Sequence, residues 1–393
     1  MKLKFNSNKT ALIRVDFNVP MHNSKILDLN RVHAAIPTIQ YCLNNKMSVV
    51  LMSHFGRPIK KNTEFSLKKL LKPLSEILNK KVLFHSDLKK DISTKNIPLQ
   101  NNEVILLENL RFYSGEVNND INFAKQLAKY GDIYINDAFA ASHREHASIS
   151  AVKQFFSNSK KFKGLLLSHE LEQLKKLSTL NSPYTIVVGG SKIGSKIHIL
   201  KNFINTADYI LIGGGMSFPF IKFNGGKIGS SLCNDSEVKI VKDIYNDFKN
   251  SSTKLILPVD CVTTTDLIRK TDIKICNIKN ISRSSMGVDI GPKTIQLFKS
   301  YINKSKTIMW NGPMGVSEFD EFSNGTKNIA TSIVEATQKD AYSLIGGGDT
   351  VSEISKFGLK AKFSYVSTGG GAMLEYFKHN QLKTTNDLLE IIS

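Results

Sequence analysis

The sequence predicts an α/β protein made of two doubly wound, Rossmann-like domains with parallel sheets. Short runs that are apolar throughout, such as residues 48–52 and 184–188, alternate with segments of helical pattern along the 393 residues. Strands of this kind are buried on both faces, as in parallel sheets that helices cover on each side. The length suffices for two domains with separate cores. The loops after these runs are rich in arginine in the first half and in glycine in the second half.

Four apolar segments of the first half are expected to be strands, and a helix is expected from Arg31 to Tyr41. The strands are 11–15, 48–52, 104–107 and 133–135, and each runs into polar or charged residues. Ligands of parallel sheets bind beyond the carboxyl ends of the strands, so side chains just past these ends should converge. The converging set is Asp16, Asn18, His54, Arg57, Arg111 and Arg144, with Arg31 at the helix start.

Arginine is scarce in this chain, which makes its positions informative. Only seven of the 53 basic residues are arginine, and five of the seven precede residue 150. The guanidinium group is a planar fork that binds carboxylate or phosphate through two parallel hydrogen bonds. One such position taken alone is best explained as an ordinary surface residue. Four of them beyond strand ends predict a small ligand that carries several negative charges.

The second half is expected to contain six strands, 184–188, 209–212, 254–257, 307–310, 344–345 and 363–367, most of them followed by glycine-rich loops. Glycine has no Cβ, so backbone N–H groups can approach an anion closely. In 344–350, three glycines precede Asp349 and Thr350, and a helix that begins there turns its positive dipole end toward a phosphate. Asp349 would supply the oxygen ligand that Mg²⁺ prefers. A plain strand-to-helix turn explains this stretch equally well, but the set of glycine loops predicts a nucleotide site.

Residues 189–196 read G-x-x-x-x-G-S-K, which departs from the phosphate-binding pattern G-x-x-x-x-G-K-[ST] in its last two positions. A P-loop NTPase is therefore rejected, and neither a dinucleotide fingerprint nor protein-kinase motifs occur. Lys192 and Lys196 are expected on one face of a helix start, where two ammonium groups can meet phosphate. A solvated helix face is the alternative.

A helix over 164–180 is expected to join the two domains. It places Leu167, Leu171, Leu174 and Leu177 on one face, at the spacing of an amphipathic helix. We interpret these leucines as packing residues and the helix as a candidate hinge.

Composition argues against several other classes of protein. The net charge of +19 comes mostly from lysines scattered along the chain, without zinc-finger spacing or basic runs interleaved with aromatic residues, so no specific nucleic-acid binding is expected. No apolar run of 18 residues and no signal-peptide core occur, so a cytoplasmic protein without a membrane partner is expected. Cys42, Cys233, Cys261 and Cys276 are widely spaced and indicate neither a disulfide framework nor a zinc site.

Together these motifs resemble those of the phosphoglycerate kinase family, from about Arg14 to Leu374. The matching motifs are RVDFNVP at 14–20, SHFGRP at 53–58, LENLRF at 107–112, NDAFAASHREHAS at 136–148, GGSKIGSKI at 189–197, WNGPMGV at 310–316, and GGGDT at 346–350 with STGGGA at 367–372; DIGPKT at 289–294 also fits. The resemblance implies a phosphoglycerate-binding domain over 1–165, to which 380–393 return, an interdomain helix over 166–181, and a nucleotide-binding domain over 182–379.

The resemblance also implies the activity of the family in glycolysis. That activity is direct transfer of a phosphoryl group between 1,3-bisphosphoglycerate and MgADP, giving 3-phosphoglycerate and MgATP without a covalent phosphoenzyme. A phosphoryl group in flight spreads its charge over its oxygens, so positioning and positive charge do most of the catalysis. His54, His143 and His146 are therefore interpreted as hydrogen-bonding or structural residues, since a carboxylate acceptor needs no deprotonation. Hinge closure and action as a monomer are implied as well.

Carried over residue by residue, the resemblance assigns three sets of contacts. The phosphoglycerate set is Asp16, Phe17, Asn18, Arg31, His54, Phe55, Gly56, Arg57, Arg111 and Arg144. The nucleotide set places Gly213, Gly214 and Gly215 at the adenine, Glu318 at the ribose and Asp349 at the magnesium ion. Its other members are Lys192, Lys196, Asn311, Pro313, Gly346, Gly347, Gly348 and Thr350. The set around the transferred group is Arg31, Lys192, Lys196, Gly348 and Gly370, with N–H groups of Gly369 to Gly371.

Three residues depart from the pattern of many relatives, which have Asp in place of Ser195, Leu in place of Phe55 and Phe in place of Ser317. Loss of an acidic neighbour would alter the charge around Lys196, and Ser317 would loosen the nucleotide pocket, so nucleotide affinity is the property most affected. Two other hypotheses stay open. One is a catalytically silent relative that uses its positive charge to hold nucleic acid, and the other is a kinase of another small acid.

Overall fold

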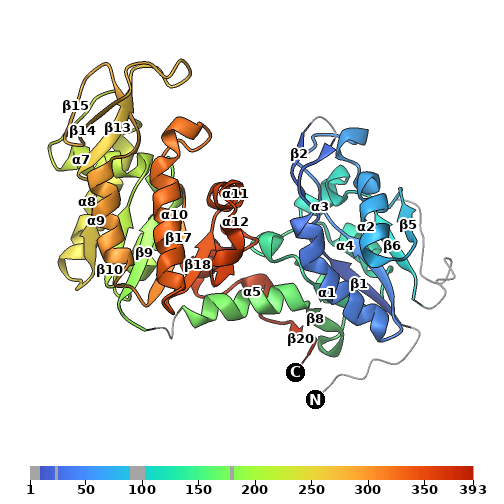
Figure 1. Ribbon diagram of the computed structural model, residues 1–393. Coiled ribbons are helices and arrows are strands. Elements are labelled where there is room, and N and C mark those ends of the chain that lie inside the picture. The colour runs from blue at the N-terminus through green and yellow to red at the C-terminus, as the bar shows by residue number, and fades with distance from the viewer. Residues whose placement is uncertain (1–8, 23–24, 89–101, 178–180, 393) are drawn as a thin grey trace. The chain divides into compact units, whose positions relative to one another are not determined.

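Figure 1 shows the chain as a computed structural model that describes residues 9–22, 25–88, 102–177 and 181–392. These residues form two compact units. Unit 1 holds the residues up to Gln173 and those from Gln381 onward, and unit 2 holds Leu174–Asn380. Both units contain parallel sheets and helices, so the predicted α/β class is confirmed. Within the described parts of the chain, no helix is long and apolar enough to cross a membrane.

Unit 1 is built on seven parallel strands, which are β1 (Thr10–Arg14), β4 (Ser48–Met52), β5 (Val82–His85), β6 (Val104–Leu107), β7 (Ile133–Asn136), β8 (Lys161–Lys163) and β20 (Leu389–Glu390). Their order is β20-β8-β7-β1-β4-β6-β5. The four predicted strands β7, β1, β4 and β6 form the centre. Successive strands lie on opposite sides of β1, so the loops after β1 and β7 diverge at a switch point of the kind where α/β proteins bind ligands.

Helices cover the sheet of unit 1 and bury its apolar strands. The predicted helix at Arg31 is present as α1 (Asn30–Asn44), and it turns Val32, Ala35 and Ile39 into the same core as Ile13 and Leu51 of the sheet. This spacing is that of one helix face. The remaining helices that begin in this unit are α2 (Leu71–Leu78), α3 (Ser114–Val117), α4 (Ile121–Ala128) and α5 (Leu165–Lys176).

The end of the chain returns to unit 1, as the predicted fold class requires. β20 pairs in parallel with β8, with Leu389 opposite Phe162 (Figure 1). Asp387 bridges two largely buried lysines, with Oδ1 2.5 Å from Lys153 Nζ and Oδ2 3.0 Å from Lys161 Nζ. The C-terminal segment therefore supplies both a strand and a counter-charge to this unit.

Unit 2 is built on six parallel strands, which are β9 (Tyr184–Val188), β10 (Tyr209–Ile212), β12 (Lys254–Ile256), β17 (Thr307–Asn311), β18 (Tyr342–Gly346) and β19 (Tyr365–Val366). All six correspond to predicted strands, and their order is β12-β10-β9-β17-β18-β19. The direction of winding reverses between β9 and β17, which makes a second switch point at the carboxyl ends of these strands.

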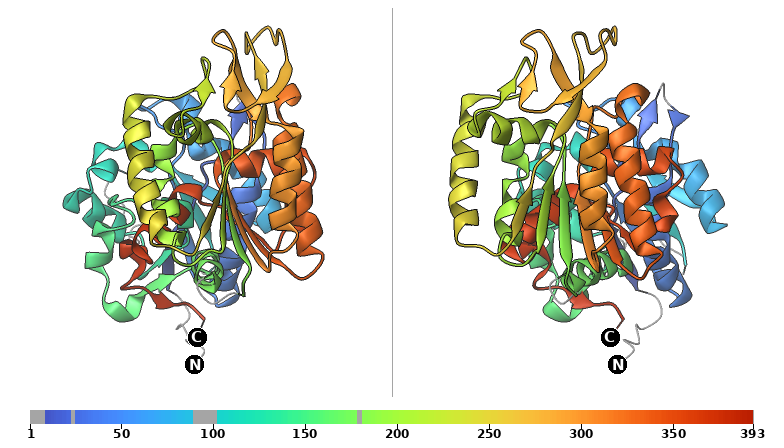
Figure 2. Two further views of the ribbon diagram at one scale, coloured as in Figure 1. Left: turned by 90° about the vertical axis from the view of Figure 1, so that its left-hand side faces the viewer. Right: turned by 60° about the vertical axis from the view of Figure 1, so that its left-hand side comes forward.

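The helices of unit 2 lie on both faces of this sheet. Figure 2 shows α8 (Asp235–Lys249) on one face and α9 (Pro292–Ile302) and α10 (Asn324–Thr337) on the other. The core between the sheet and these two helices contains Phe298, Ile333 and Trp310, all buried. The other helices are α6 (Ile197–Phe203), α7 (Phe218–Phe223), α11 (Gly348–Lys356) and α12 (Gly370–His379).

Short strands outside the two main sheets were not predicted. Unit 2 has a three-stranded sheet in the order β14-β13-β16, made of β13 (Asp260–Thr264), β14 (Lys274–Asn277) and β16 (Met286–Ile290). It also has a parallel pair of β11 (Lys227–Ile228) with β15 (Asn280–Ile281), and unit 1 has a hairpin of β2 (Met21–His22) and β3 (Lys25–Ile26). The residues of β14 are mostly exposed, so they lack the apolar run that identifies a buried strand.

The predicted joining helix is present as α5 and is shorter than predicted. It ends at Lys176, and residues 178–180 lie outside the described part of the chain. Leu167, Leu174 and Leu177 are buried, and Leu171 is half-buried.

Candidate functional site

The polar residues beyond the strand ends of unit 1 are joined by hydrogen bonds. Arg31 in the first turn of α1 donates through Nη1 to Asp16 Oδ2 at 2.6 Å. The loop after β1 meets the loop after β4, because the N–H of Gly56 donates to Asn18 Oδ1 at 2.8 Å. The guanidinium group of Arg111, from the loop after β6, donates to the carbonyl of Gly56. The loops after β1, β4 and β6 thus form one site.

The arginines of unit 1 repel one another, which shows that they share one electrostatic field. Burial, followed by the charges of Arg144, Arg14 and Arg57, lowers the pKa of Arg111 to about 10. Burial and the neighbouring Arg57 also lower the pKa of Arg144. Arg144 follows β7, so all four predicted loops contribute to the site. A group of guanidinium ions that depress one another's pKa is stabilised by a bound anion.

His54 is buried beside this site and is held neutral. Burial, followed by the charges of Arg14, Arg111, Arg144 and Arg31, lowers its pKa well below the ordinary value. Arg14 Nη2 lies 3.0 Å from His54 Nδ1. Because arginine only donates hydrogen bonds, Nδ1 must accept, and the proton of the neutral ring is on Nε2. His54 is therefore a hydrogen-bond donor at Nε2, in line with its predicted role.

Arg14 and Glu116 support the site, and the sequence interpretation missed both of them. Arg14 is fully buried at the end of β1, and its Nε donates to Ser148 Oγ at 2.8 Å. Ser148 Oγ donates in turn to Glu116 Oε1 at 2.6 Å, and its N–H donates to Oε2 at 3.0 Å. A buried charge needs a partner. The sequence signal for Arg14 was a charged residue inside an otherwise apolar strand.

Phe17 and Phe55 contribute their backbone to this region, since both rings are buried in the core. The N–H of Phe17 donates to Ser53 Oγ at 2.9 Å, and the N–H of Phe55 donates to Asn109 Oδ1 at 3.0 Å. Gly56 follows with a φ of +62°, and a Cβ there would lie 2.3 Å from the Phe65 ring. This turn therefore needs glycine for both conformation and space.

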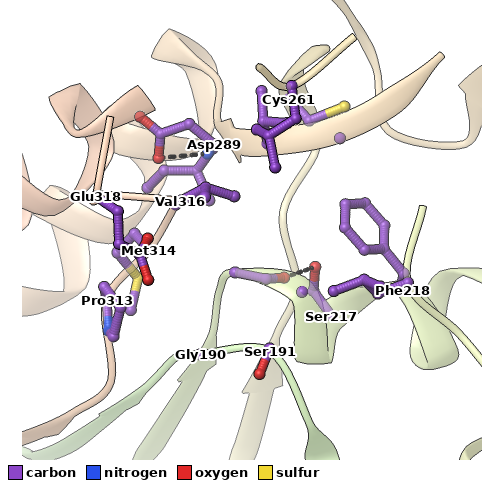
Figure 3. A pocket seen from close by; sticks show the side chains of 18 of the residues that line it. Gly190, Ser191, Ser217, Phe218, Cys261, Asp289, Pro313, Met314, Val316 and Glu318 are labelled. Atoms are coloured by element: carbon purple, nitrogen blue, oxygen red, sulfur yellow. Dashed lines mark hydrogen bonds between the residues drawn. The ribbon is translucent and has the colours of Figure 1, made fainter. Parts of the chain in front are cut away.

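Unit 2 contains a pocket of about 230 Å³ that opens to solvent. Figure 3 shows Pro313, Met314, Val316 and Glu318 on one side of it and Ser217 and Phe218 on the other. Of the predicted nucleotide residues, Gly214, Gly215, Pro313, Glu318 and Asp349 line it. The sequence interpretation did not include Asp289 and Cys261 of its wall, which lie on the unpredicted antiparallel strands.

Glycines allow three loops to meet beneath this pocket. The N–H of Gly190, after β9, donates to the carbonyl of Pro313, after β17, at 2.8 Å. The carbonyl of Gly190 accepts from Met216 N, after β10, at 2.9 Å. A Cβ on Gly214, whose φ is +63°, would lie 2.9 Å from Gly190 N. Gly213 lies directly under the pocket, because a Cβ there would be 2.5 Å from Met314 Sδ.

Lys196 and Asn311 form a polar group next to the glycines that end β18. The ammonium group of Lys196 donates to Asn311 Oδ1, and burial lowers its pKa to about 8 although Asp349 opposes the shift. Lysine only donates, so the amide must turn its oxygen to Lys196. Asn311 Nδ2 is buried and has no hydrogen-bond partner among the described residues. A buried donor of this kind is satisfied by a ligand that accepts a hydrogen bond.

The N-termini of α11 and α12 lie next to each other near this polar group. A Cβ on Gly370 would be 2.8 Å from Gly347 Cα, and a Cβ on Gly347 would be 3.3 Å from Asn311 Nδ2. The space around Gly348 is open. Thr350 Oγ1 faces inward and accepts from Gly312 N at 2.7 Å. Two helix N-termini with free space in front are suited to a phosphate.

The prediction that Lys192 and Lys196 share one face of a helix is wrong. Lys192 has extended backbone angles, and a short 3₁₀ turn, η7 (Ile193–Ser195), follows it. α6 begins only after Lys196. Lys192 therefore lies outside any helix, and the spacing of four residues does not fix the two ammonium groups on one side.

The residues of unit 2 suit a magnesium ion that arrives with a nucleotide better than a resident metal. Within the described residues, no group of three or more His, Cys, Asp or Glu side chains could hold a metal ion. Asp349, in the first turn of α11, and Glu318 bring exposed carboxylates to the pocket. Mg²⁺ is commonly bound by one or two carboxylates together with substrate phosphates.

Comparison with known proteins identifies the family. A family model described as phosphoglycerate kinase matches residues 2–380. The chain belongs to the phosphoglycerate kinase family. It is 44% identical over 378 residues to the phosphoglycerate kinase of Thermosipho africanus, covering 95% of this chain and 93% of that protein. It is 43% identical over 379 residues to the phosphoglycerate kinase of Prochlorococcus marinus, covering 95% and 94%.

Solved structures of phosphoglycerate kinases have the same fold. The phosphoglycerate kinase from Coxiella burnetii matches with a TM-score of 0.85 at 36% identity, covering 97% of this chain and 96% of that chain. The enzyme from Pyrococcus horikoshii matches with a TM-score of 0.83 at 29% identity, with the same coverage of 97% and 96%.

Family membership confirms the resemblance drawn from the motifs. As a phosphoglycerate kinase, the chain is a glycolytic phosphotransferase with a carboxyl group as acceptor, and it uses ADP or ATP as co-substrate. The assignment of individual residues to ligands stays a prediction. Two of the residues that differ from many relatives are Phe55 and Ser317. The ring of Phe55 packs against Phe65 at 6.2 Å between ring centroids, and Ser317 is buried between two residues of the pocket wall.

Proposed function

We propose that this phosphoglycerate kinase transfers a phosphoryl group directly between 1,3-bisphosphoglycerate and MgADP, without a covalent phosphoenzyme. The observation that carries the proposal is the field of arginines in unit 1, in which burial and neighbouring guanidinium charges lower the pKa of both Arg111 and Arg144. Such a field favours a small ligand with several negative charges. Phosphoglycerate carries a carboxylate and a phosphate, which match the geometry of arginine.

In unit 1, Arg57, Arg111 and Arg144 bind the charged groups of phosphoglycerate, and the Nε2–H of His54 donates to one of its oxygens. Arg31 is held by Asp16 and is partly exposed, so its remaining N–H groups are free to bind the group in transfer. Arg14 acts as a positioning residue, because it fixes the tautomer of His54. Asn18 and Gly56 shape the loop that the substrate contacts.

In unit 2, the apolar pocket walls at Gly214 and Phe218 hold the adenine, and Glu318 binds the ribose. Lys196, the amide of Asn311 and the helix N-termini at Gly348 and Gly370 bind the phosphates. Asp349 holds the Mg²⁺ that accompanies the nucleotide, and the ion supplies neutralisation of phosphate charge. Lys192, which is exposed, reaches the transferred group when both ligands are bound.

Transfer needs no nucleophile or general base from the protein. The attacking carboxylate or ADP oxygen is already ionised, so the chain contributes positive charge and N–H groups around the phosphoryl oxygens. The neutral state of His54 agrees with this, since its lowered pKa makes it a poor base. Because the ligands bind to two units, we propose hinge closure at α5 that expels water before transfer. One chain supplies all the residues that are proposed to bind the substrates, so we propose that it acts as a monomer.

Consumption of MgATP with and without 3-phosphoglycerate tests the reaction. The acyl phosphate is trapped by a coupling enzyme so that the unfavourable direction is drawn forward. We expect a rate that requires 3-phosphoglycerate. A comparable rate with other small acids, or none with a folded protein, would contradict the proposal.

Substitution Arg31→Ala tests the division of ligands between the units. Turnover should fall by roughly 10²- to 10³-fold, the usual effect of removing one donor to the charge that develops in transfer. MgADP affinity should stay nearly unchanged. Arg283→Ala, at an exposed arginine of unit 2 outside the pocket, is the matched control and should leave both quantities unaltered. Equal loss of turnover and MgADP binding in Arg31→Ala would refute the assignment.

A further inference from the structure

Two cysteines face each other across neighbouring strands beside the pocket of unit 2. Cys261 of β13 is directly opposite Cys276 of β14, their sulfur atoms are 3.8 Å apart, and both thiols are free. Opposite residues of antiparallel strands have Cα atoms about 4.5–5.5 Å apart. Disulfides span Cα separations of about 4.4–6.8 Å. We propose that Cys261 and Cys276 form a reversible disulfide that modifies the pocket wall.

The two thiols differ in exposure, which sets the order of reaction. Cys261 is 1% exposed, and burial raises the pKa of its thiol. Cys276 is half-exposed on β14, which is the edge strand of its sheet. An oxidant from solvent therefore meets Cys276 first, and Cys261 acts second.

Hydrogen peroxide is an oxidant of the required chemical class. The Cys276 thiolate attacks one peroxide oxygen, the O–O bond breaks, and the departing hydroxide takes up a proton as water. The product is a sulfenic acid on Cys276. Cys261 then loses its proton and attacks that sulfur, the S–O bond breaks, and a second water leaves. Two thiols and one peroxide give one disulfide and two waters, and a dithiol reductant reverses the change.

The bond would change the shape of the pocket, in which Figure 3 places Cys261 at the upper wall. On its other side Cys261 is opposite Ile290 of β16, whose neighbour Asp289 also lines the pocket. Bringing the sulfur atoms from 3.8 Å to about 2.05 Å draws Cys261 toward β14 and away from the pocket. The oxidised pocket should bind ADP roughly threefold to tenfold more weakly. This consequence rests on the proposed function, whereas bond formation does not.

Peptide mapping of the full chain tests the bond. The reduced protein is treated with hydrogen peroxide, alkylated and digested; trypsin cuts after Arg269 and Lys274, so the two cysteines fall in separate peptides. We expect a 261–276 cross-link and a fall from four to two free thiols. A variant with Cys42→Ser and Cys233→Ser should give the same cross-link, and C276S should give none. In C261S, dimedone should trap the sulfenic acid on Cys276, whereas in C276S it should not label Cys261.

Absence of the 261–276 cross-link, or equal cross-linking to Cys42 or Cys233, would overturn the proposed site. The effect on the pocket is measured as the Kd for ADP of the reduced and oxidised variant that lacks Cys42 and Cys233. Equal values would overturn the coupling to the pocket. Failure of the reduced protein to bind ADP would instead reject the proposed function and leave the cross-link result intact. Thermal unfolding of each serine variant shows whether it is folded.

Discussion

Lys196 illustrates how burial makes a single residue sensitive to pH. Its pKa is lowered to about 8, although the nearby Asp349 opposes the shift. The ammonium form attracts phosphate and the neutral amine does not, so ADP affinity should fall as pH rises through 8. Well above pH 8 the charged fraction, and with it the affinity, should drop about tenfold per pH unit. Calorimetric titration with ADP between pH 7 and pH 9.5 measures this.

Two comparisons isolate Lys196 in that titration. Arginine keeps its charge throughout this range, so Lys196→Arg should remove the slope above pH 8. Adenosine, which has no phosphate, should bind with the same affinity at every pH. A slope that persists in Lys196→Arg would show that another group causes it.

Residues at the ends of apolar strands could be predicted from the sequence because parallel sheets bring those ends together. Arg57, Arg111 and Arg144 are examples, and the structure confirms that their charges interact. Glu116 could not be found in this way. It is hydrogen-bonded to Ser148, which lies 32 positions away in the chain. The pattern of a single sequence does not show which residues so far apart are in contact.

At the scale of elements, the start of α5 depends on a buried carboxyl group. Asp137 Oδ1 accepts hydrogen bonds from Leu166 N at 2.9 Å and Leu167 N at 3.3 Å, while Thr38 Oγ1 accepts from Leu165 N at 2.9 Å. A Cβ on Gly164 would lie 2.1 Å from Asp137 Oδ1, so glycine is required for this approach. Burial raises the pKa of Asp137 to about 7, although its own hydrogen bonds with Thr38, Leu167 and Leu166 oppose the shift.

The raised pKa of Asp137 predicts how stability changes with pH. The native state binds this proton more tightly than the unfolded chain, where the ordinary value of 3.8 applies. The contribution of this carboxyl group to the free energy of unfolding is therefore fully present below about pH 4, and it is lost as pH rises to about 7. Asparagine has no such proton, so Asp137→Asn should gain roughly 1–3 kcal/mol relative to the unsubstituted protein between these pH values. Urea unfolding at several pH values measures the difference.

Asp132→Asn is the matched control for this substitution. Asp132 is exposed and accepts from Thr10 N at 2.8 Å, so it also hydrogen-bonds the backbone of unit 1. Its substitution should not reproduce the change in relative stability between pH 4 and pH 7. Parallel pH profiles for Asp137→Asn and the unsubstituted protein would show that the buried carboxyl group does not titrate in this range.

Elements with a strong local signal were predicted, and elements that depend on distant partners were not. The strands of both parallel sheets are apolar throughout, so burial on two faces identifies them. β14 is largely exposed and exists because β13 pairs with it. The start of α5 uses Asp137 and Thr38 in place of a local capping residue, and the leucine pattern still located it within one residue of Leu165.

For the whole molecule, the return of the C-terminus to unit 1 was predicted from the family resemblance alone. β20 consists of two exposed residues, which have no periodicity that could identify a strand. Its position follows from pairing with β8 and from the buried side chains of Leu388 and Ile391. The order of strands in a sheet is a property of the complete chain, and local patterns do not determine it.

This return predicts that residues 1–173 need the C-terminal segment in order to fold stably. Without it, β8 loses its partner strand β20, Ile391 is lost from the core, and Lys153 and Lys161 lose the carboxylate of Asp387. Residues 1–173 joined by a flexible linker to 381–393 should unfold cooperatively on heating, and 1–173 alone should unfold at a much lower temperature or show no transition. The joined fragment with Asp387→Ala should lie between them, because it keeps Leu388 and Ile391 in the core and loses only the counter-charge. Equal midpoints for the fragments with and without 381–393 would mean that unit 1 is complete without the end of the chain.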